Sequence, residues 1–438
     1  MSLRRILADY GMVAVLLLLC GCFTIATLDE QPVTRATAVP QIASRVASLG
    51  TSSRVLIAVG VTSEDSAFAA QLQAAIESAG AIVVATVKGQ PVDVRRELVR
   101  LSQSGDRLDA IACTEESVKW AAFEDLPADF PALGAPQIIG PQATLWPTFL
   151  TVDNLINVAS QISVIAIMAI GMTIVIITGG IDLSVGSLVA LSAVVSTWLI
   201  RELFGGLSAN SVGMATACVA GVAVTGLVGI FSGAMITKLA VPPFIVTLAM
   251  MLVASGLAFM LSDGESVYHV PDSFTWLGRE ADLFGLPNSV LLMLVLYLAA
   301  QVLMTRTVLG RHFYCVGGNR TAAWLSGVPV DRVLMWAYVI SALLAGLGGV
   351  VIASQLKSGS PSYGAMYELY VIAAVVVGGT SLSGGEGRMF GTLIGAFIIA
   401  VIQNGMNLTN IGSYAQKVVL GFVILGAVIL DRLRRRPA

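Results

Sequence analysis

The sequence predicts an α-helical membrane protein with many spans and one inserted water-soluble domain. Of its 438 residues, 56% are hydrophobic and only 12% are charged, and the mean hydropathy is +0.84. Soluble domains carry about 25% charged residues, so most of this chain belongs in a bilayer. The exception is 29–147, which holds 14 of the 27 acidic residues. We therefore expect a first transmembrane helix at 1–28, an extracytoplasmic α/β domain at 29–147 and a transmembrane domain at 148–438.

A spanning helix needs about 20 apolar residues, and the sequence contains about ten such stretches. They lie at 10–28, 160–181, 184–203, 212–237, 242–262, 288–306, 334–354, 367–382, 389–407 and 414–431. The first stretch also fits a secretory signal peptide. Its cleavage would leave an odd number of spans, so we expect it to stay as a helix.

The loops between these spans differ in charge. Cytoplasmic loops are enriched in Lys and Arg, and the 305–333 loop carries four Arg, whereas the 263–287 loop is mainly acidic. Both termini are also basic (Arg4 and Arg5; Arg432 and Arg434–Arg436). With an even number of spans, both termini and the 305–333 loop lie on the same side. We therefore expect a multi-pass protein of the inner (plasma) membrane with both termini in the cytoplasm.

The stretch 29–147 alternates β-rich and amphipathic segments. Strands are expected at 54–60, 81–87 and 108–113, with helices at 65–79 and 92–102 between them. This order predicts a small parallel sheet. The pattern resembles part of one lobe of a periplasmic sugar-binding protein. A generic docking or assembly module is the alternative, because a clamshell binding protein needs two lobes.

Glycines and polar residues interrupt two of the apolar stretches. The first interruption contains Gly179, Gly180, Asp182 and Ser184, and the second contains Gly378, Gly379 and Thr380. Irregular backbone survives in a bilayer only where it is buried in protein or lines a polar path. These residues are therefore candidates for a broken helix beside a translocation pathway, which predicts a transporter. For Asp182 the alternative is an N-cap of the following helix.

Several longer segments carry a family resemblance. They are FLTVDNL at 149–155, GMTIVIITGGIDLSVGS at 171–187, LGRHFYCVGGN at 309–319, LSGV at 325–328, VGGTSLSGGEGR at 377–388, GTLIG at 391–395 and NGMNL at 404–408. From Thr148 onward, the chain resembles the permease subunits of bacterial ABC importers for ribose and related monosaccharides. Such permeases pass almost directly from the first span to the FLT segment, whereas here the residues 29–147 intervene.

The resemblance implies a transport subunit that is not itself an enzyme. Its expected partners are cytoplasmic ATP-binding-cassette ATPase subunits, an extracytoplasmic sugar-binding protein, and a second permease copy or a paralogue. ATP use by the ATPases would drive alternating access for a ribose-like sugar.

The resemblance also assigns residues. The 309–328 loop would carry the helix that couples the permease to the ATPase, with Gly310, Arg311, Gly317, Gly318, Asn319, Arg320, Ser326 and Gly327 as its candidate residues. A solvated basic loop is the alternative. Asn404 and Asn407 could hydrogen-bond a sugar hydroxyl in the pathway or join two helices.

Other functions find less support in the sequence. The net charge of −2 gives no ground for a nucleic-acid partner, and the five cysteines form no metal-like set, so no cofactor is expected. The residues 382–386 spell the signature motif of ABC ATPases, but the chain has no Gly-Lys dipeptide for a phosphate loop. An ion-coupled secondary transporter would need more intramembrane acids than Asp182 and Glu368. A ligand-sensing receptor that uses 29–147 would need an output domain.

Overall fold

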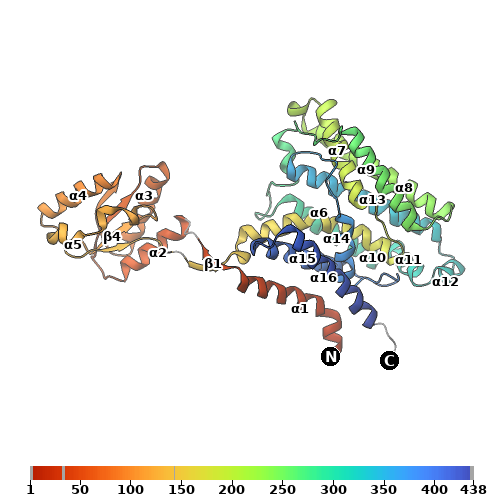
Figure 1. Cartoon of the computed structure of the whole chain (residues 1–438), viewed down its shortest axis with the longest axis horizontal. Coiled ribbons are helices and arrows are strands. Elements are labelled where there is room, and N and C mark those ends of the chain that lie inside the picture. The colour runs from red at the N-terminus through yellow and green to blue at the C-terminus, as the bar shows by residue number, and fades with distance from the viewer. Residues whose placement is uncertain (1–2, 32–34, 143, 435–438) are drawn as a thin grey trace. The chain divides into compact units, whose positions relative to one another are not determined.

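The structure is a computed structural model that describes residues 3–31, 35–142 and 144–434. Arg435 and Arg436 of the basic C-terminus lie outside these ranges. The chain forms two compact units, one of Met1–Thr27 with Pro147–Ala438 and one of Leu28–Trp146. We call the first the membrane unit and the second the inserted unit. The membrane unit is built of helices, and the inserted unit contains a sheet (Figure 1).

The membrane unit contains seven helices that are long and apolar enough to cross a membrane, among the described residues. They are α6 (Val152–Ile177), α7 (Val185–Glu202), α8 (Ser211–Lys238), α9 (Pro243–Leu261), α10 (Asn288–Arg306), α13 (Val330–Leu356) and α15 (Met389–Leu408). The other three expected spans correspond to α1 (Leu3–Ala26), α14 (Tyr367–Val377) and α16 (Ser413–Arg434), in which shorter apolar stretches were found. Two short helices, α11 (Val308–Gly318) and α12 (Arg320–Leu325), join α10 to α13.

The expected span at 367–382 is wrong in its length. The helix α14 has 11 residues, which at about 1.5 Å per residue cover little more than half of a hydrocarbon core about 30 Å thick. The helix begins after Met366, whose φ is +69°, and ends before Gly379, whose φ is +88°. Both are left-handed backbone conformations that an α-helix cannot contain. Hydropathy does not reveal these two helix ends, because the residues around them are apolar or small.

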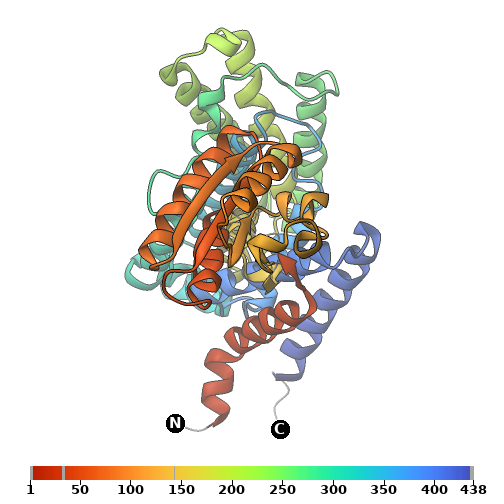
Figure 2. The same cartoon turned by 90° about the vertical axis from the view of Figure 1, so that its left-hand side faces the viewer.

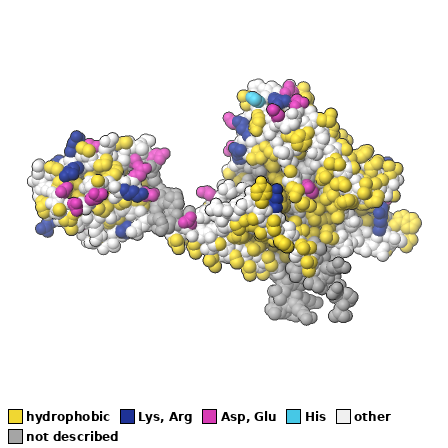
Figure 3. Space-filling view, viewed as in Figure 1, with side chains coloured by type: hydrophobic (Ala, Val, Ile, Leu, Met, Phe, Trp, Pro, Cys, Tyr) yellow, Lys and Arg dark blue, Asp and Glu magenta, His cyan; other side chains and the backbone are white. Residues whose placement is uncertain are grey.

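The helix α6 forms the centre of the membrane unit. It packs against α10, α13, α14 and α15, and 89% of its most apolar window is buried inside the unit. By contrast, only 28% of the corresponding window of α9 is buried. Hydrophobic side chains cover much of the visible face of this unit (Figure 3). Such a surface is expected of a protein that lies in lipid, while a helix apolar all round belongs in its interior.

Glycines allow close approach between several helices. A Cβ atom at Gly391 or Gly395 of α15 would collide with the backbone of α14, at Gly378 and Ala374. Likewise, a Cβ atom at Gly229 of α8 would lie 2.9 Å from the carbonyl oxygen of Tyr338 on α13. The small-residue spacing in the sequence therefore reflects helix packing, as in other membrane proteins.

The inserted unit leaves and re-enters the membrane unit at one point. The Thr148 amide donates to the Thr27 carbonyl at 2.9 Å, and the Phe149 amide donates to Thr27 Oγ1 at 3.1 Å. The rings of Phe23 and Phe149 also lie 6.2 Å apart. The end of α1 and the start of the chain leading to α6 are thus held side by side, so an insertion here leaves the helical packing intact.

The inserted unit is an α/β fold with two sheets. Its elements are β1 (Leu28–Gln31), α2 (Arg35–Ala47), β2 (Arg54–Val59), α3 (Ser63–Ser78), β3 (Ile82–Lys88), α4 (Pro91–Gln103), β4 (Ala110–Cys113), α5 (Leu126–Asp129), β5 (Gln137–Ile139) and β6 (Thr144–Pro147). The strands β3, β2, β4 and β5 form a parallel sheet in that order. Apolar clusters lie on both faces of this sheet, which has helices on each side (Figure 2). The strands, helices and parallel sheet expected from the sequence are confirmed.

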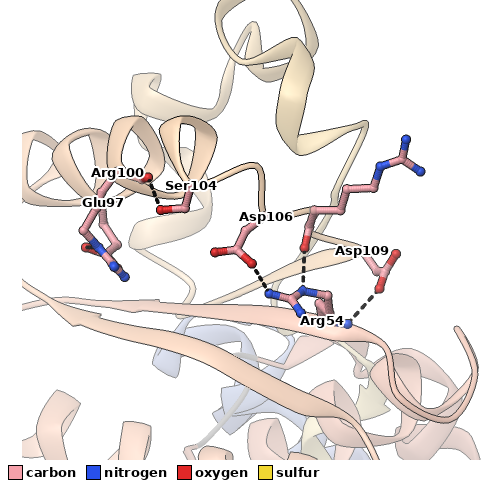
Figure 4. Close-up of polar contacts among 7 residues, drawn as sticks. Arg54, Glu97, Arg100, Ser104, Asp106 and Asp109 are labelled. Carbon is pink, nitrogen blue, oxygen red and sulfur yellow. Dashed lines mark hydrogen bonds and ion pairs between the residues drawn. The ribbon is translucent and has the colours of Figure 1, made fainter.

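Polar contacts at the start of β2 join that strand to the α4–β4 connection (Figure 4). The Arg54 amide donates to Asp109 Oδ2 at 2.7 Å, its Nε donates to the Arg107 carbonyl at 3.0 Å, and its guanidinium pairs with Asp106. Ser104 Oγ donates to the Arg100 carbonyl at 2.9 Å, at the end of α4. These groups are paired with one another, so the cluster holds the starts of two central strands together rather than offering a ligand site.

Candidate functional site

The first candidate break follows α6. The Gly180 amide donates to the Val175 carbonyl at 3.0 Å, and the Gly179 amide donates to the Ile176 carbonyl at 2.9 Å. Gly179 has a φ of +80°. This pair of bonds around a left-handed glycine is the Schellman ending of an α-helix. The chain then turns over 180–184 before α7 begins at Val185.

Asp182 is the buried anchor of this turn. Asp182 is only 2% exposed. Its Oδ1 accepts from the Ser184 amide at 3.0 Å and from Ser184 Oγ at 2.6 Å, and its Oδ2 accepts from Ser341 Oγ of α13 at 2.8 Å. The N-cap of α7 is Ser184 rather than Asp182. The N-cap alternative for Asp182 is therefore wrong; the contacts show that Asp182 orders the turn before α7 and joins it to α13.

The second candidate break, after α14, repeats this construction. The Thr380 amide donates to the Val375 carbonyl at 3.1 Å, and the Gly379 amide donates to the Val376 carbonyl at 2.9 Å. Ser381 Oγ then accepts from the Ser383 amide at 3.1 Å, as Asp182 accepts from Ser184. Thr380 is 1% exposed and its hydroxyl has no hydrogen-bond partner. The two halves of the membrane unit thus contain the same helix ending followed by the same kind of side-chain turn.

The two breaks meet. The Gly385 amide donates to the Ile177 carbonyl at 2.8 Å. A Cβ atom at Gly384 would lie 3.2 Å from the Cα of Gly179. A Cβ atom at Gly317, in the last turn of α11, would collide with the Ile177 carbonyl and lie 2.6 Å from the Gly385 nitrogen. Three segments that are far apart in the sequence therefore share one backbone junction.

The short helices α11 and α12 project from this junction. Thr307 Oγ1 accepts from the Gly310 amide at 3.1 Å, which caps α11, and Tyr314 Oη donates to the Gly387 carbonyl at 2.8 Å. Asn319 Oδ1 accepts from the Ala322 amide at 2.9 Å, which caps α12. Gly327, at φ +79°, follows the end of α12. The loop 309–328 is thus a pair of capped helices attached to both breaks.

Most of the coupling candidates are exposed. Arg311, Gly318, Arg320, Ser326 and Gly327 lie on the surface, whereas Gly310 is buried. The helix α12 also exposes two large apolar side chains that the sequence analysis did not single out.

The two exposed apolar side chains of α12 are Trp324 and Leu325, which are 68% and 73% exposed. Because they lie outside the apolar spans, next to charged residues, they form a candidate docking surface. In the sequence, an aromatic residue within a charged loop was the signal that could have indicated this surface.

The two asparagines join helices. Asn154 and Asn404 exchange two amide hydrogen bonds of 3.0 and 2.8 Å between α6 and α15. Asn407 Oδ1 accepts from Gln416 Nε2 of α16 at 2.7 Å. Of the two alternatives for Asn404 and Asn407, these contacts favour helix-to-helix hydrogen bonding.

The irregular segment 357–366 between α13 and α14 was not predicted from the sequence. It starts beside the 263–287 loop, where Val267 and Gly359 exchange backbone hydrogen bonds of 2.6 and 2.9 Å. Lys357 pairs with Asp272 of that loop, and this cation lowers the pKa of the Asp272 carboxyl. Pro361 and the glycines at 359 and 364 were the signal for this segment.

The comparisons with known proteins agree with the helical architecture. Residues 154–428 match the family model described as branched-chain amino acid transport system / permease component. The chain belongs to this permease family. It is 42% identical to the ribose import permease RbsC of Escherichia coli K12 over 297 residues, which cover 67% of this chain and 90% of that protein. The expected resemblance to ribose-type ABC permeases is confirmed.

Other relatives are named for ribose or for another sugar. The Bacillus subtilis ribose import permease RbsC is 42% identical over 65% of this chain and 87% of its own length. The D-allose transport system permease AlsC of E. coli K12 is 37% identical over 65% of this chain and 85% of its own length. No solved structure shows a significant similarity to the chain. The family and these relatives together support an ABC sugar-transport permease of the inner membrane rather than a secondary transporter or a receptor.

Replacement of Asp182 by Ala is expected to destabilise the membrane unit. It leaves the Ser184 amide and the Ser341 hydroxyl without their buried acceptor, at a cost of about 1–3 kcal/mol for each unsatisfied group. Asp182→Asn keeps one acceptor oxygen, so its unfolding midpoint in detergent should lie between those of Asp182→Ala and the unchanged protein. Asp153→Ala, at an exposed acid of α6, is the control. An Asp182→Ala protein that melts like this control would contradict the anchoring role.

Proposed function

We propose that this chain is the membrane-spanning subunit of an ABC importer that carries a ribose-like monosaccharide across the inner membrane. The observation that carries the proposal is the 42% identity to ribose import permeases over 90% of such a protein. Permeases named for ribose are 38–42% identical to the chain, and those named for allose and arabinose are 37% and 38% identical. A ribose-like pentose is therefore the first substrate to test.

The chain itself has a transport role, and ATP is hydrolysed in a partner. The LSGGE segment at 382–386 lies in the break between α14 and α15, where the Ser381 amide donates to the Glu386 carbonyl at 3.0 Å. Leu382, Ser383 and Glu386 of this turn are exposed, but the chain has no Gly-Lys phosphate loop, so the likeness to the ATPase signature is a coincidence of sequence. Two ATPase subunits would supply the energy, and a second permease copy or a paralogue would complete the membrane pore.

The proposed mechanism is alternating access. A partner can shift a membrane protein between two states only through contacts that differ between those states. The junction of Gly317 with the two breaks supplies such a connection, because a displacement of α11 must move the Ile177 carbonyl or the Gly385 amide. In this scheme the loop 309–328 is cytoplasmic, and Gly317, Gly318, Asn319 and Arg320 lie at its coupling helices.

The proposed topology places both termini in the cytoplasm and counts ten membrane helices, α14 being one that crosses only part of the bilayer. The inserted unit is then extracytoplasmic, because it follows α1. An external sugar-binding protein would deliver the sugar on that side. Co-purification of such a protein would support docking on the permease, whereas an ATPase without any binding protein would support the inserted unit taking over part of its role.

The function is tested by transport in vesicles. The tagged chain is purified from its own membranes in mild detergent, and the proteins that accompany it are identified by mass spectrometry. The complex is then reconstituted, and uptake of labelled ribose is measured with and without ATP, with allose and arabinose as competitors. We expect a stoichiometric ATPase and ATP-dependent ribose uptake. Uptake that follows an ion gradient and needs no ATPase would contradict the proposal.

The exposed side chains of α12 predict the ATPase contact. Trp is enriched among interface residues whose truncation costs about 2 kcal/mol or more, which corresponds to roughly 30-fold in affinity. Trp324→Ala should therefore reduce the ATPase retained by the tagged chain in detergent by about this factor. Trp336→Ala is the matched control, because Trp336 is 52% exposed on the spanning helix α13. Equal retention by the two variants would rule out α12 as the docking helix.

A further inference from the structure

The segment 357–366 returns into the membrane unit along α7. A Cβ atom at Gly359 would collide with Thr197 Oγ1 of α7, and one at Gly364 would lie 3.0 Å from Val189 Cβ of the same helix. A Cβ atom at Gly364 would also meet the Gly186 carbonyl, near the start of α7. From Thr197 back to Gly186 the helix covers about 16 Å, roughly half of a 30 Å hydrocarbon core. The helix α14 therefore begins near mid-membrane depth.

The helix α7 begins at a similar depth. Asp182, in the turn before α7, accepts a hydrogen bond from Ser341 of α13. Ser341 lies 11 residues after Val330, the first residue of α13. That distance along α13 is again about 16 Å. The first turns of α7 and α14 are adjacent, since a Cβ atom at Gly186 would collide with Glu368 Oε2 and the Gly364 carbonyl. The N-termini of α7 and α14 therefore lie side by side within the membrane unit.

A cavity of about 320 Å³ lies beside these two first turns. The helix α9 and the segment 361–366 complete its wall, and its lining includes Ser187, Ser255, Phe259, Ser362 and Glu368. This volume is at the lower end of the range of small-molecule pockets, about 300–1,000 Å³. We call it the Glu368 cavity.

The polar groups of the Glu368 cavity are available to a ligand. The described structure shows no hydrogen bond or ion pair from the side chains of Ser187, Ser255 or Glu368 to any other described residue. Glu368 is only partly exposed. An acid within a membrane span costs about 2.5–3.5 kcal/mol on insertion scales and marks a polar pathway by default. The fold therefore keeps a costly carboxylate here that is hydrogen-bonded to its own backbone amide and to no other described residue.

We propose that the Glu368 cavity is a transit site for a neutral monosaccharide near the membrane midplane. The carboxylate accepts hydrogen bonds from two neighbouring sugar hydroxyls, Ser187 and Ser255 donate or accept, and Phe259 covers the apolar face of the ring. The negative charge of Glu368 also opposes anionic relatives such as sugar phosphates. This inference rests on the proposed function, since it names the place and the chemistry of the sugar path.

A second cavity, of about 290 Å³, lies across α14 and is lined by Gln161, Gln355, Gln403 and Tyr367 among others. It also offers polar groups, but Gln355 Nε2 is already bonded to the Ser160 carbonyl at 3.0 Å, and no carboxylate lines it. The Glu368 cavity carries the stronger signal for a polyol because it contains a carboxylate that no described cation pairs with.

The test compares two serines in the reconstituted complex. Ser255 of α9 lines the Glu368 cavity, whereas Ser232 of α8 is buried elsewhere and its hydroxyl is also unpartnered. Glu368→Gln and Ser255→Ala should lower ATP-dependent ribose uptake at least 10-fold and 3-fold, respectively, and Ser232→Ala should leave it unchanged. Glu368→Gln should also reduce the preference for ribose over ribose 5-phosphate.

A labelling measurement keeps the proposal testable if Glu368→Gln fails to assemble. Ser255→Cys should react with a small, water-soluble thiol reagent, as followed by mass spectrometry of its peptide, and saturating ribose should slow the reaction. Ser232→Cys should not react. If the unchanged complex transports ribose but Glu368→Gln does so at the same rate, or Ser255→Cys labels no faster than Ser232→Cys, the inference is overturned. Failure of the unchanged complex to transport ribose would instead contradict the proposed function.

Discussion

The rest of the membrane unit depends on the backbone junction where α6, α11 and the loop after α14 meet. The Gly385 amide bonds to the Ile177 carbonyl at 2.8 Å, and Gly317 lies against both groups with no room for a Cβ atom. Contacts made by backbone atoms alone have little freedom to adjust, because no flexible side chain separates the segments. In the proposed mechanism, a movement of α11 and α12 is transmitted to both helix breaks together, and through Asp182 and Ser341 to α13.

The junction lies far along the chain fold from the insertion. The inserted unit joins the chain between Thr27 and Thr148, whose backbone groups bond to each other at 2.9 Å. Those residues lie at the opposite end of α6 from Ile177 and the junction. A soluble unit could therefore be added at this point without disturbing the breaks or the short helices α11 and α12. The parallel sheet of the inserted unit has its own apolar cores on both faces, so it needs no packing against the membrane helices.

Much of the fold was predictable because it depends on local signals. Hydropathy located the long spans, and alternating β-rich and amphipathic segments located the sheet of the inserted unit. The contacts of the site were not predictable, because they join residues that are far apart in the chain. Asn404 pairs with Asn154 of another helix, and Asp182 bonds to Ser341. The shortness of α14 and the re-entrant course of 357–366 depend on backbone conformation at Met366 and Gly379, which hydropathy does not report.

The most direct measurement compares Gly317→Ala with Gly318→Ala in the reconstituted complex. A Cβ atom at Gly317 meets the backbone of both breaks, whereas a Cβ atom at Gly318 has nothing within 4 Å. We predict that both variants assemble with the ATPase and hydrolyse ATP, but that Gly317→Ala loses at least 10-fold in ribose uptake while Gly318→Ala transports normally. Normal uptake by Gly317→Ala would show that transport does not depend on this junction.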